Sequence, residues 1–179
     1  MATDGSNDLG GSVRVRSCTA SDFDAMLAII NDAAIAYRGV IPADCWHEPY
    51  MPASELASEI AAAISFAGCE HAGTLVGVMG SQSVQDVTLI RHAYVATRAQ
   101  GRGVGTALLR HLRAETDRPI LIGTWAAATW AIRFYEKHGF RLIEGSEKNA
   151  LLKKYWTVPD RQIETSVVLA DQRWQHRRA

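Results

Sequence analysis

The fold is decided by one stretch of the chain, AYVATRAQGRGVGTALL at positions 93–109. It begins with β-branched and aromatic residues typical of a strand, passes through a glycine cluster, and continues with apolar residues at helical spacing. The glycines at 101, 103 and 105 leave the backbone N–H groups of the predicted helix start uncovered. Because a helix start carries unpaired donors and partial positive charge, this stretch predicts a site for a phosphate or pyrophosphate.

The spacing of the glycines separates the kinds of phosphate site. A P-loop requires a lysine followed by serine or threonine at its end, and this stretch has no lysine. A dinucleotide fingerprint requires a third glycine where Thr106 stands, and an acidic residue about twenty positions further on. The pattern that fits is Gln/Arg-x-x-Gly-x-Gly/Ala, here Gln100, Gly103 and Gly105. It resembles the acyl-CoA pyrophosphate loop of the GNAT family of N-acetyltransferases.

A second motif supports the same resemblance. Residues 131–140 read AIRFYEKHGF, which is similar to the A-x-x-F-Y-E-K-x-G-F signature of the family. The motif follows the glycine loop at the distance that the family shows, and the resemblance extends from Val13 to Leu169. It implies the GNAT fold, an α/β architecture with a central mixed, mostly antiparallel sheet of six to seven strands flanked by about four helices.

Periodicity along the chain predicts the same order of elements. Apolar residues at three- and four-residue steps predict a helix from Phe23 to Tyr37 and a second whose apolar side runs from Leu56 to Ala67. In a later helix, Trp130 and Tyr135 are expected to point inward. Strands are expected at 13–16, 69–73, 75–82, 86–95, 120–125, 140–143 and 162–169, helices follow the glycine loop and strand 120–125, and a short helix lies at 149–156. We expect residues 1–12 to form a disordered tail, residues 13–170 a single GNAT domain, and residues 171–179 a solvated polar tail.

Composition limits the classes of function. The 179 residues include nineteen basic and nineteen acidic side chains, so no overall field favours nucleic acid or a membrane as a partner. No run of eighteen apolar residues predicts a membrane span, and the first residues lack the apolar segment of a signal peptide. The three cysteines have no metal-ligand spacing. We therefore expect a cytoplasmic protein with reduced thiols and no metal site.

The resemblance implies acetyl-CoA as co-substrate and assigns residues to it. The strand that ends at Val95 would pair with the pantetheine arm and splay from strand 120–125, and the Val95 N–H would stabilise the oxyanion of the attacked thioester. Tyr135 matches the tyrosine that protonates the departing thiolate; without the motif, it would be read as a buried core aromatic. The expected cofactor-binding residues are Ala93, Tyr94, Val95, Gln100, Gly101, Arg102, Gly103, Val104, Gly105 and Thr106.

Two positions depart from the family pattern. Many relatives carry an asparagine at the position of Ala128, where it holds the pantetheine, and a glutamate at the position of Leu89, where it activates the amine. Arg91 is expected to share a strand face with Leu89 and Val95, and an arginine cannot act as a base. Simple alternation places His92 on the opposite face, although a bulge would reverse this. The general base therefore stays open among His92, Glu48, His47, Glu164, a water molecule, or no dedicated group.

The resemblance predicts an enzyme that moves an acetyl group from acetyl-CoA to a primary amine by direct attack in a ternary complex. The predicted acceptor groove is rich in aromatic residues, which favours a small-molecule amine over a long charged peptide. The alternative is a non-catalytic acyl-CoA-binding sensor on the same fold. The sequence leaves open the amine itself, the use of other acyl groups, and homodimerisation through the last strands. The residues expected at the acceptor are Tyr37, Trp46, Arg91 and Trp125, with Tyr50, Tyr155 and Trp156 around them.

Overall fold

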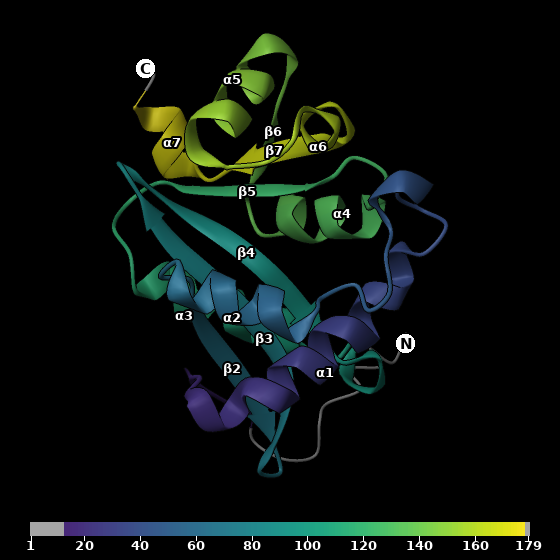
Figure 1. Ribbon diagram of the computed structural model, residues 1–179. Coiled ribbons are helices and arrows are strands. Elements are labelled where there is room, and N and C mark those ends of the chain that lie inside the picture. The colour runs from purple at the N-terminus through teal and green to yellow at the C-terminus, as the bar shows by residue number, and fades with distance from the viewer. Residues whose placement is uncertain (1–12, 178–179) are drawn as a thin grey trace, which may run out of the picture.

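The computed structural model describes residues 13–177, so the tail predicted for residues 1–12 lies outside the described residues. A seven-stranded sheet runs through the molecule in the order β1-β2-β3-β4-β5-β7-β6 (Figure 1). Neighbouring strands are antiparallel except β4 and β5, which are parallel. The strands are β1 Val13–Ser17, β2 Ser65–His71, β3 Thr74–Val84, β4 Val87–Val95, β5 Ile120–Trp125, β6 Arg141–Ile143 and β7 Ser166–Ala170.

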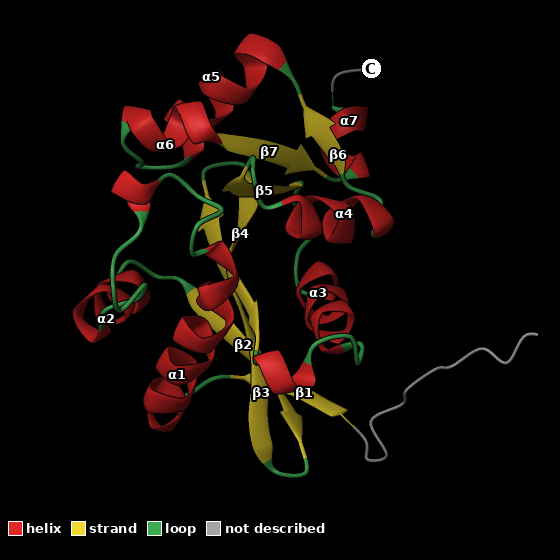
Figure 2. Ribbon diagram, turned by 90° about the vertical axis from the view of Figure 1, so that its right-hand side faces the viewer, coloured by secondary structure: helices red, strands yellow, loops and turns green. Residues whose placement is uncertain are grey.

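Helices cover both faces of the sheet. Figure 2 shows α3 and α4 on one face and α1 and α2 on the other, with α5 and α6 covering the far end beside β7. The mixed sheet with flanking helices confirms the predicted fold class, although the described residues contain seven α-helices instead of about four. They are α1 Phe23–Ala34, α2 Ala53–Ala61, α3 Val104–Ala114, α4 Thr129–Lys137, α5 Gly145–Tyr155, α6 Asp160–Thr165 and α7 Gln172–His176. None of the described helices has the length and apolar character needed to cross a membrane.

The sheet opens between its two parallel strands. β4 pairs with β5 only from Thr88 to Ile90, opposite Ile120 to Ile122. Beyond that point the two strands diverge, and β5 continues alone against β7 as far as Trp125 (Figure 1). The expected splay between these strands is therefore present, and side chains from both of them line the opening.

Several element boundaries differ from those predicted. The second helix ends at Ala61, because Ala63 adopts a left-handed backbone (φ 66°) and Ala67 already pairs in β2 with Ser17 and Met79. The short helix expected at 149–156 is the longer α5. Trp130 does not point inward, since its side chain is 43% exposed.

The end of the chain is also more ordered than predicted. The strand expected from residue 162 begins only at Ser166, because Pro159 opens a helix that occupies residues 160–165. The segment predicted to be a solvated tail contains α7. Asp171 is buried, and its carboxylate accepts hydrogen bonds from the N–H groups of Ile120 (3.2 Å) and Trp174 (3.2 Å). The last helix is thereby fixed to the start of β5.

Candidate active site

The glycine loop joins the end of β4 to the start of α3. Gly101 (φ 74°) and Gly103 (φ 80°) adopt the left-handed region that side chains disfavour. Gly103 is the N-cap of α3, and the first turn of that helix has no preceding carbonyls to accept from its N–H groups. Gly105 leaves room for the ring of Phe134, which a Cβ there would meet at 3.3 Å. The structure thus presents a helix start with free donors, as the sequence pattern indicated.

Two side chains hold this loop in place. The Gln100 amide donates to the carbonyl oxygen of Val95 (3.2 Å), which ties the loop back to the end of β4. The Thr97 N–H donates to a carboxylate oxygen of Asp32 in α1 (2.6 Å). The loop that leads to the helix start is therefore fixed both to the end of β4 and to α1.

A long cavity of about 580 Å³ runs from the helix start toward α4. Arg102, which is exposed at the loop, is not among the residues that line it. Trp130, Phe134 and Lys137 of α4 form its far wall. The other expected cofactor-binding residues all line this cavity: Ala93, Tyr94, Val95, Gln100, Gly101, Gly103, Val104, Gly105 and Thr106.

A second cavity of about 160 Å³ lies where β4 and β5 diverge. Its walls come from Arg91 and His92 of β4, from Thr124 and Trp125 of β5, and from Trp156 after α5. The two cavities share five lining residues, which are Tyr37, Ala93, Tyr94, Ala131 and Tyr135. Two molecules, one bound in each cavity, would therefore come closest to each other at these shared residues, which include Tyr135.

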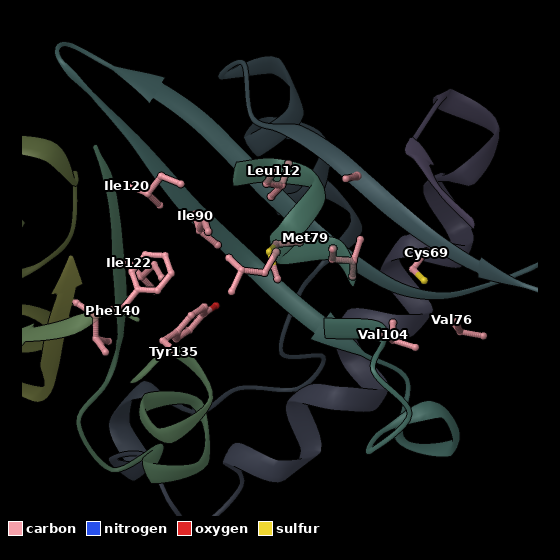
Figure 3. Close-up of a cluster of buried hydrophobic side chains, with 14 of the residues drawn as sticks. Cys69, Val76, Met79, Ile90, Val104, Leu112, Ile120, Ile122, Tyr135 and Phe140 are labelled. Atoms are coloured by element: carbon pink, nitrogen blue, oxygen red, sulfur yellow. The ribbon is translucent and has the colours of Figure 1, made fainter. Parts of the chain in front are cut away.

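Tyr135 projects from α4 into the apolar layer beneath the sheet. Only 5% of the residue is exposed, and its ring meets Phe134 and Phe140 edge-on, with centroids 5.1 and 5.8 Å away. Figure 3 shows it among apolar side chains that include Ile90 and Ile122. Burial raises the pKa of its hydroxyl above the usual value. The phenol therefore stays protonated at neutral pH and can serve as a proton donor.

A β-bulge interrupts β4 beside the second cavity. Val78 pairs with Tyr94 and Gly80 pairs with Arg91, so His92 and Ala93 both lie opposite Met79. His92 takes a left-handed backbone (φ 51°). The bulge that would reverse the alternation is therefore present.

The bulge changes which side chains share a face of β4. Arg91 and His92 both reach the carboxylate of Glu59 in α2, so simple alternation was wrong for His92. The expectation that Val95 shares a face with Arg91 was also wrong. Val95 packs against the cluster that contains Ile90, beneath α3.

The backbone N–H and C=O of Val95 point toward the opening in the sheet. The Ala96 N–H donates to the Val76 carbonyl (2.9 Å), which makes the flanking pair Gly77 and Val95 a non-hydrogen-bonded pair of the antiparallel ladder. At such a position, the residue's own N–H and C=O point away from the partner strand. The Val95 N–H is therefore directed from β3 toward the side where β5 has diverged.

Glu59 is a site residue that the sequence analysis missed. Its carboxylate lies 3.0 Å from Nε2 of His92 and 3.5 Å from the Arg91 guanidinium. The pKa of Glu59 is lowered by the hydrogen bond from His92 and by the charge of Arg91, against the effect of burial. No local signal marks this glutamate, because its partner on β4 lies 33 positions away.

The other candidates for the base lie elsewhere. Glu48 is exposed and paired with Arg38, and Glu164 is exposed beside Arg161 (3.8 Å). His47 stacks on the outer side of Tyr50, with ring centroids 6.0 Å apart. None of these three lines either cavity.

Aromatic side chains close the outer end of the smaller cavity. Tyr37 stacks on Tyr50 (5.7 Å between centroids), and the Trp125 indole N–H donates to the Tyr50 hydroxyl (3.3 Å). Trp46 packs on Tyr50 (5.5 Å) without lining the cavity. Tyr155 also lies outside it, since its buried hydroxyl donates to Asp86 (2.8 Å). Of the residues expected at the acceptor, the structure thus brings together Tyr37, Arg91 and Trp125 with Tyr50 and Trp156.

Comparisons with known proteins agree with this geometry. Residues 62–142 match the family model described as an acetyltransferase (GNAT) domain. No curated protein sequence matches the chain significantly. Over these residues the chain is similar to GNAT acetyltransferase domains, which confirms the resemblance found in the sequence.

Solved structures show the same fold. The chain is similar to the PaiA N-acetyltransferase of Thermoplasma acidophilum in complex with coenzyme A (15% identity, TM-score 0.67, 89% of this chain and 98% of that chain). It is also similar to the ribosomal-protein-S18-alanine N-acetyltransferase of Escherichia coli (20%, 0.64, 89% and 93%). A third is a GNAT family acetyltransferase of Elizabethkingia anophelis with acetyl-CoA bound (20%, 0.57, 89% and 97%). Acetyl-CoA as co-substrate fits this family.

Proposed function

We propose that the protein transfers an acetyl group from acetyl-CoA to the primary amine of a small molecule, by direct attack while both substrates are bound. The observation that carries this proposal is the meeting of two cavities at Tyr135. One cavity leads to a helix start suited to a pyrophosphate. The other is a separate chamber in which an amine can approach from the opposite side.

The longer cavity suits the CoA moiety. The N–H groups at the start of α3 would bind the pyrophosphate, and the strand edge exposed at residues 93–95 would pair with the amide groups of the pantetheine arm. The thioester would then lie where β4 and β5 diverge. There the Val95 N–H, directed away from β3, would donate to the thioester oxygen as negative charge develops on it.

Tyr135 would complete the transfer. As the amine nitrogen forms its bond to the carbonyl carbon, the C–S bond breaks and the sulfur leaves as a thiolate. The buried, protonated phenol lies between the two cavities and can give this thiolate its proton. The proton lost by the new amide nitrogen restores the phenol through solvent.

The size of the second cavity supports a small acceptor. Its volume of about 160 Å³ is close to that of an engineered cavity of about 150 Å³ that binds benzene. Its aromatic walls suit an organic amine that is held by stacking or cation–π contact. An acceptor with a single ring would fill this chamber, whereas a peptide chain would have to remain largely outside it.

The test of this function is a panel of small primary amines and a histone-like peptide, assayed by the release of free CoA thiol. We expect turnover of small amines to exceed that of the peptide. Tyr135→Phe should lower kcat tenfold or more while CoA still shifts the melting temperature as in the unaltered protein. Tight CoA binding with no turnover of any amine would instead support the non-catalytic sensor.

A further inference from the structure

The bulge in β4 brings an imidazole and a carboxylate together at the wall of the smaller cavity. His92 lines this cavity, and a carboxylate oxygen of Glu59 in α2 lies 3.0 Å from Nε2 of His92. On the basis of the function proposed above, we infer that His92 is the general base for the incoming amine and that Glu59 is its positioning residue.

The ionised state of Glu59 fixes the roles of the two ring nitrogens of His92. The lowered pKa of Glu59 keeps it ionised at neutral pH, and an ionised carboxylate only accepts hydrogen bonds. Nε2 must therefore carry the proton of the neutral imidazole and donate it to Glu59. The remaining nitrogen, Nδ1, is then unprotonated and is the one available to a molecule in the cavity.

The backbone, a ring contact and burial further hold the imidazole in this position. The left-handed backbone of His92 (φ 51°) is a conformation that costs free energy for a residue with a side chain and is kept where the surrounding structure enforces it. The ring stacks on Phe66 of β2, with centroids 6.0 Å apart and planes inclined by 24°. The His92 side chain is only 16% exposed. The imidazole is therefore fixed from the backbone, from one ring face and from Nε2.

The charged groups around the imidazole favour a role in proton transfer. Arg91 of the same strand lies against the Glu59 carboxylate and also donates to Gln82 of β3 (3.1 Å). The Glu59 carboxylate is thus shared by Arg91 and His92. Since an arginine stays protonated, His92 is the group of the two that can accept a proton. The remaining polar groups of the nearby cavity walls include the hydroxyls of Tyr37, Tyr50, Tyr94 and Tyr135.

The step balances with the groups present. A primary amine reaches the cavity as an ammonium ion, and Nδ1 of His92 takes one of its protons, leaving the nitrogen lone pair free. That lone pair forms the C–N bond as the C–S bond breaks, and the thiolate takes the Tyr135 proton. The second proton lost by the new amide nitrogen restores the Tyr135 phenol through solvent. The imidazolium then releases its proton to solvent. The net products are the N-acetylated amine, free CoA and one proton.

The kinetic test uses 2-phenylethylamine, a single-ring primary amine, with acetyl-CoA and the variant His92→Asn. Asparagine tolerates the left-handed backbone as histidine does, so the variant should fold. We expect kcat to fall about 100-fold or more near pH 7. The ratio of the unaltered kcat to the variant kcat should fall about tenfold for each pH unit toward pH 9. Below the amine pKa, the fraction of amine that is already neutral rises about tenfold per pH unit, and neutral amine needs no base. A loss that is equal at all pH values would overturn the assignment.

The positioning role of Glu59 has its own readouts. Glu59→Gln should lower kcat by about tenfold and leave the KM for acetyl-CoA unchanged. In ¹⁵N-histidine spectra, the unaltered protein should show His92 as the Nε2–H tautomer, and Glu59→Gln should mix the two tautomers. His176→Gln, at an exposed position in α7, is the matched control for both measurements and should change neither.

The outcomes separate this inference from the proposed function. The base assignment is wrong if the amine is acetylated but His92 is the Nδ1–H tautomer, or if His92→Asn keeps full activity at pH 7. In both cases the proposed acetyl transfer still stands. If the unaltered protein acetylates no amine of the panel, the proposed function fails and the role of His92 fails with it.

Discussion

The two halves of β4 share one strand but differ in almost every physical property. Residues 87–90 are buried and lie between β3 and β5, with pairing on both sides from Thr88 onward. Residues 91–95 pair only with β3, carry the bulge, and are mostly half-buried. The first half, which we call the closed half, is part of the core. The second, the open half, offers backbone and side-chain groups to a cavity. A continuous strand can thus hold a site precisely because its beginning is fixed in the sheet.

The reason for the difference lies in β5. After Ile122 this strand leaves β4 but keeps its pairing with β7 up to Trp125 and Ser166. The opening is therefore lined by a strand that is itself still anchored. Each of these two walls of the smaller cavity therefore keeps one paired neighbour, β3 for β4 and β7 for β5, although the two strands no longer pair with each other.

Proline substitutions would give the largest contrast between the halves. The Thr88 N–H donates to the Pro119 carbonyl, on the β5 side, so the next residue, Leu89, uses its N–H in the ladder with β3. Leu89→Pro should remove that bond and much of a fully buried side chain, at a cost of roughly 3 kcal/mol or more of unfolding free energy. Urea unfolding measures this, and a variant that is as stable as the unaltered protein would contradict the description of the closed half.

Val95→Pro is the matched substitution in the open half. The Val95 N–H points away from β3, so the ladder should survive and the melting temperature should change by only a few degrees. If this N–H stabilises the oxyanion, kcat should fall by about 10²–10³-fold. Full activity with the N–H removed would show that the thioester oxygen is bound by another donor.

Gly103→Ala tests the loop that follows the open half. A Cβ at this position has open space around it, so only the left-handed backbone (φ 80°) is strained. We expect a loss of about 1–2 kcal/mol in stability and a weaker thermal shift with CoA. Gly103→Asn should lose less, because asparagine tolerates this backbone conformation; equal losses in the two variants would argue against the backbone as the cause.

Glu59→Gln should have the smallest effect on stability, and that effect should depend on pH. Since the folded state lowers the pKa of Glu59, its ionised form stabilises the fold above the unfolded pKa of about 4.3, and this contribution is lost as the pH falls through the folded value. At about pH 7, the free energy of unfolding of the variant should be lower by roughly 0.5–1 kcal/mol, with no difference in strong acid. A difference that persists there would have a cause other than the carboxylate charge.

Local sequence patterns predicted the elements whose limits are set by residues that are neighbours in the chain. The strand at 120–125 is apolar over its first half and bounded by Pro119, and its predicted limits are those of β5. The glycine loop was predicted because positive backbone angles at Gly101 and Gly103, together with an uncovered helix start that Gly105 belongs to, favour glycine at these positions. Residues 160–165 were harder, because the apolar spacing of so short a segment fits either a strand or one and a half helical turns.

The contact between His92 and Glu59 could not be predicted from local sequence. Whether His92 faces α2 depends on a bulge, and a bulge is a property of the pairing between β3 and β4. The contact with Glu59 then requires α2 to pack over that strand. The residues of β4 carry no local sign of the extra residue, so the sequence indicated only what a bulge would do.

The shared wall between the two cavities has a consequence for inhibitor design. A thiol-containing ligand for the long cavity and a ring-bearing amine for the short one would come closest beside Tyr135, at the residues that line both. A single compound that joins the two through a short linker would bind its second half as an intramolecular event, at an effective concentration in about the millimolar range. Its selectivity among enzymes of this fold would come from the aromatic chamber, while most of its affinity would come from the cofactor half.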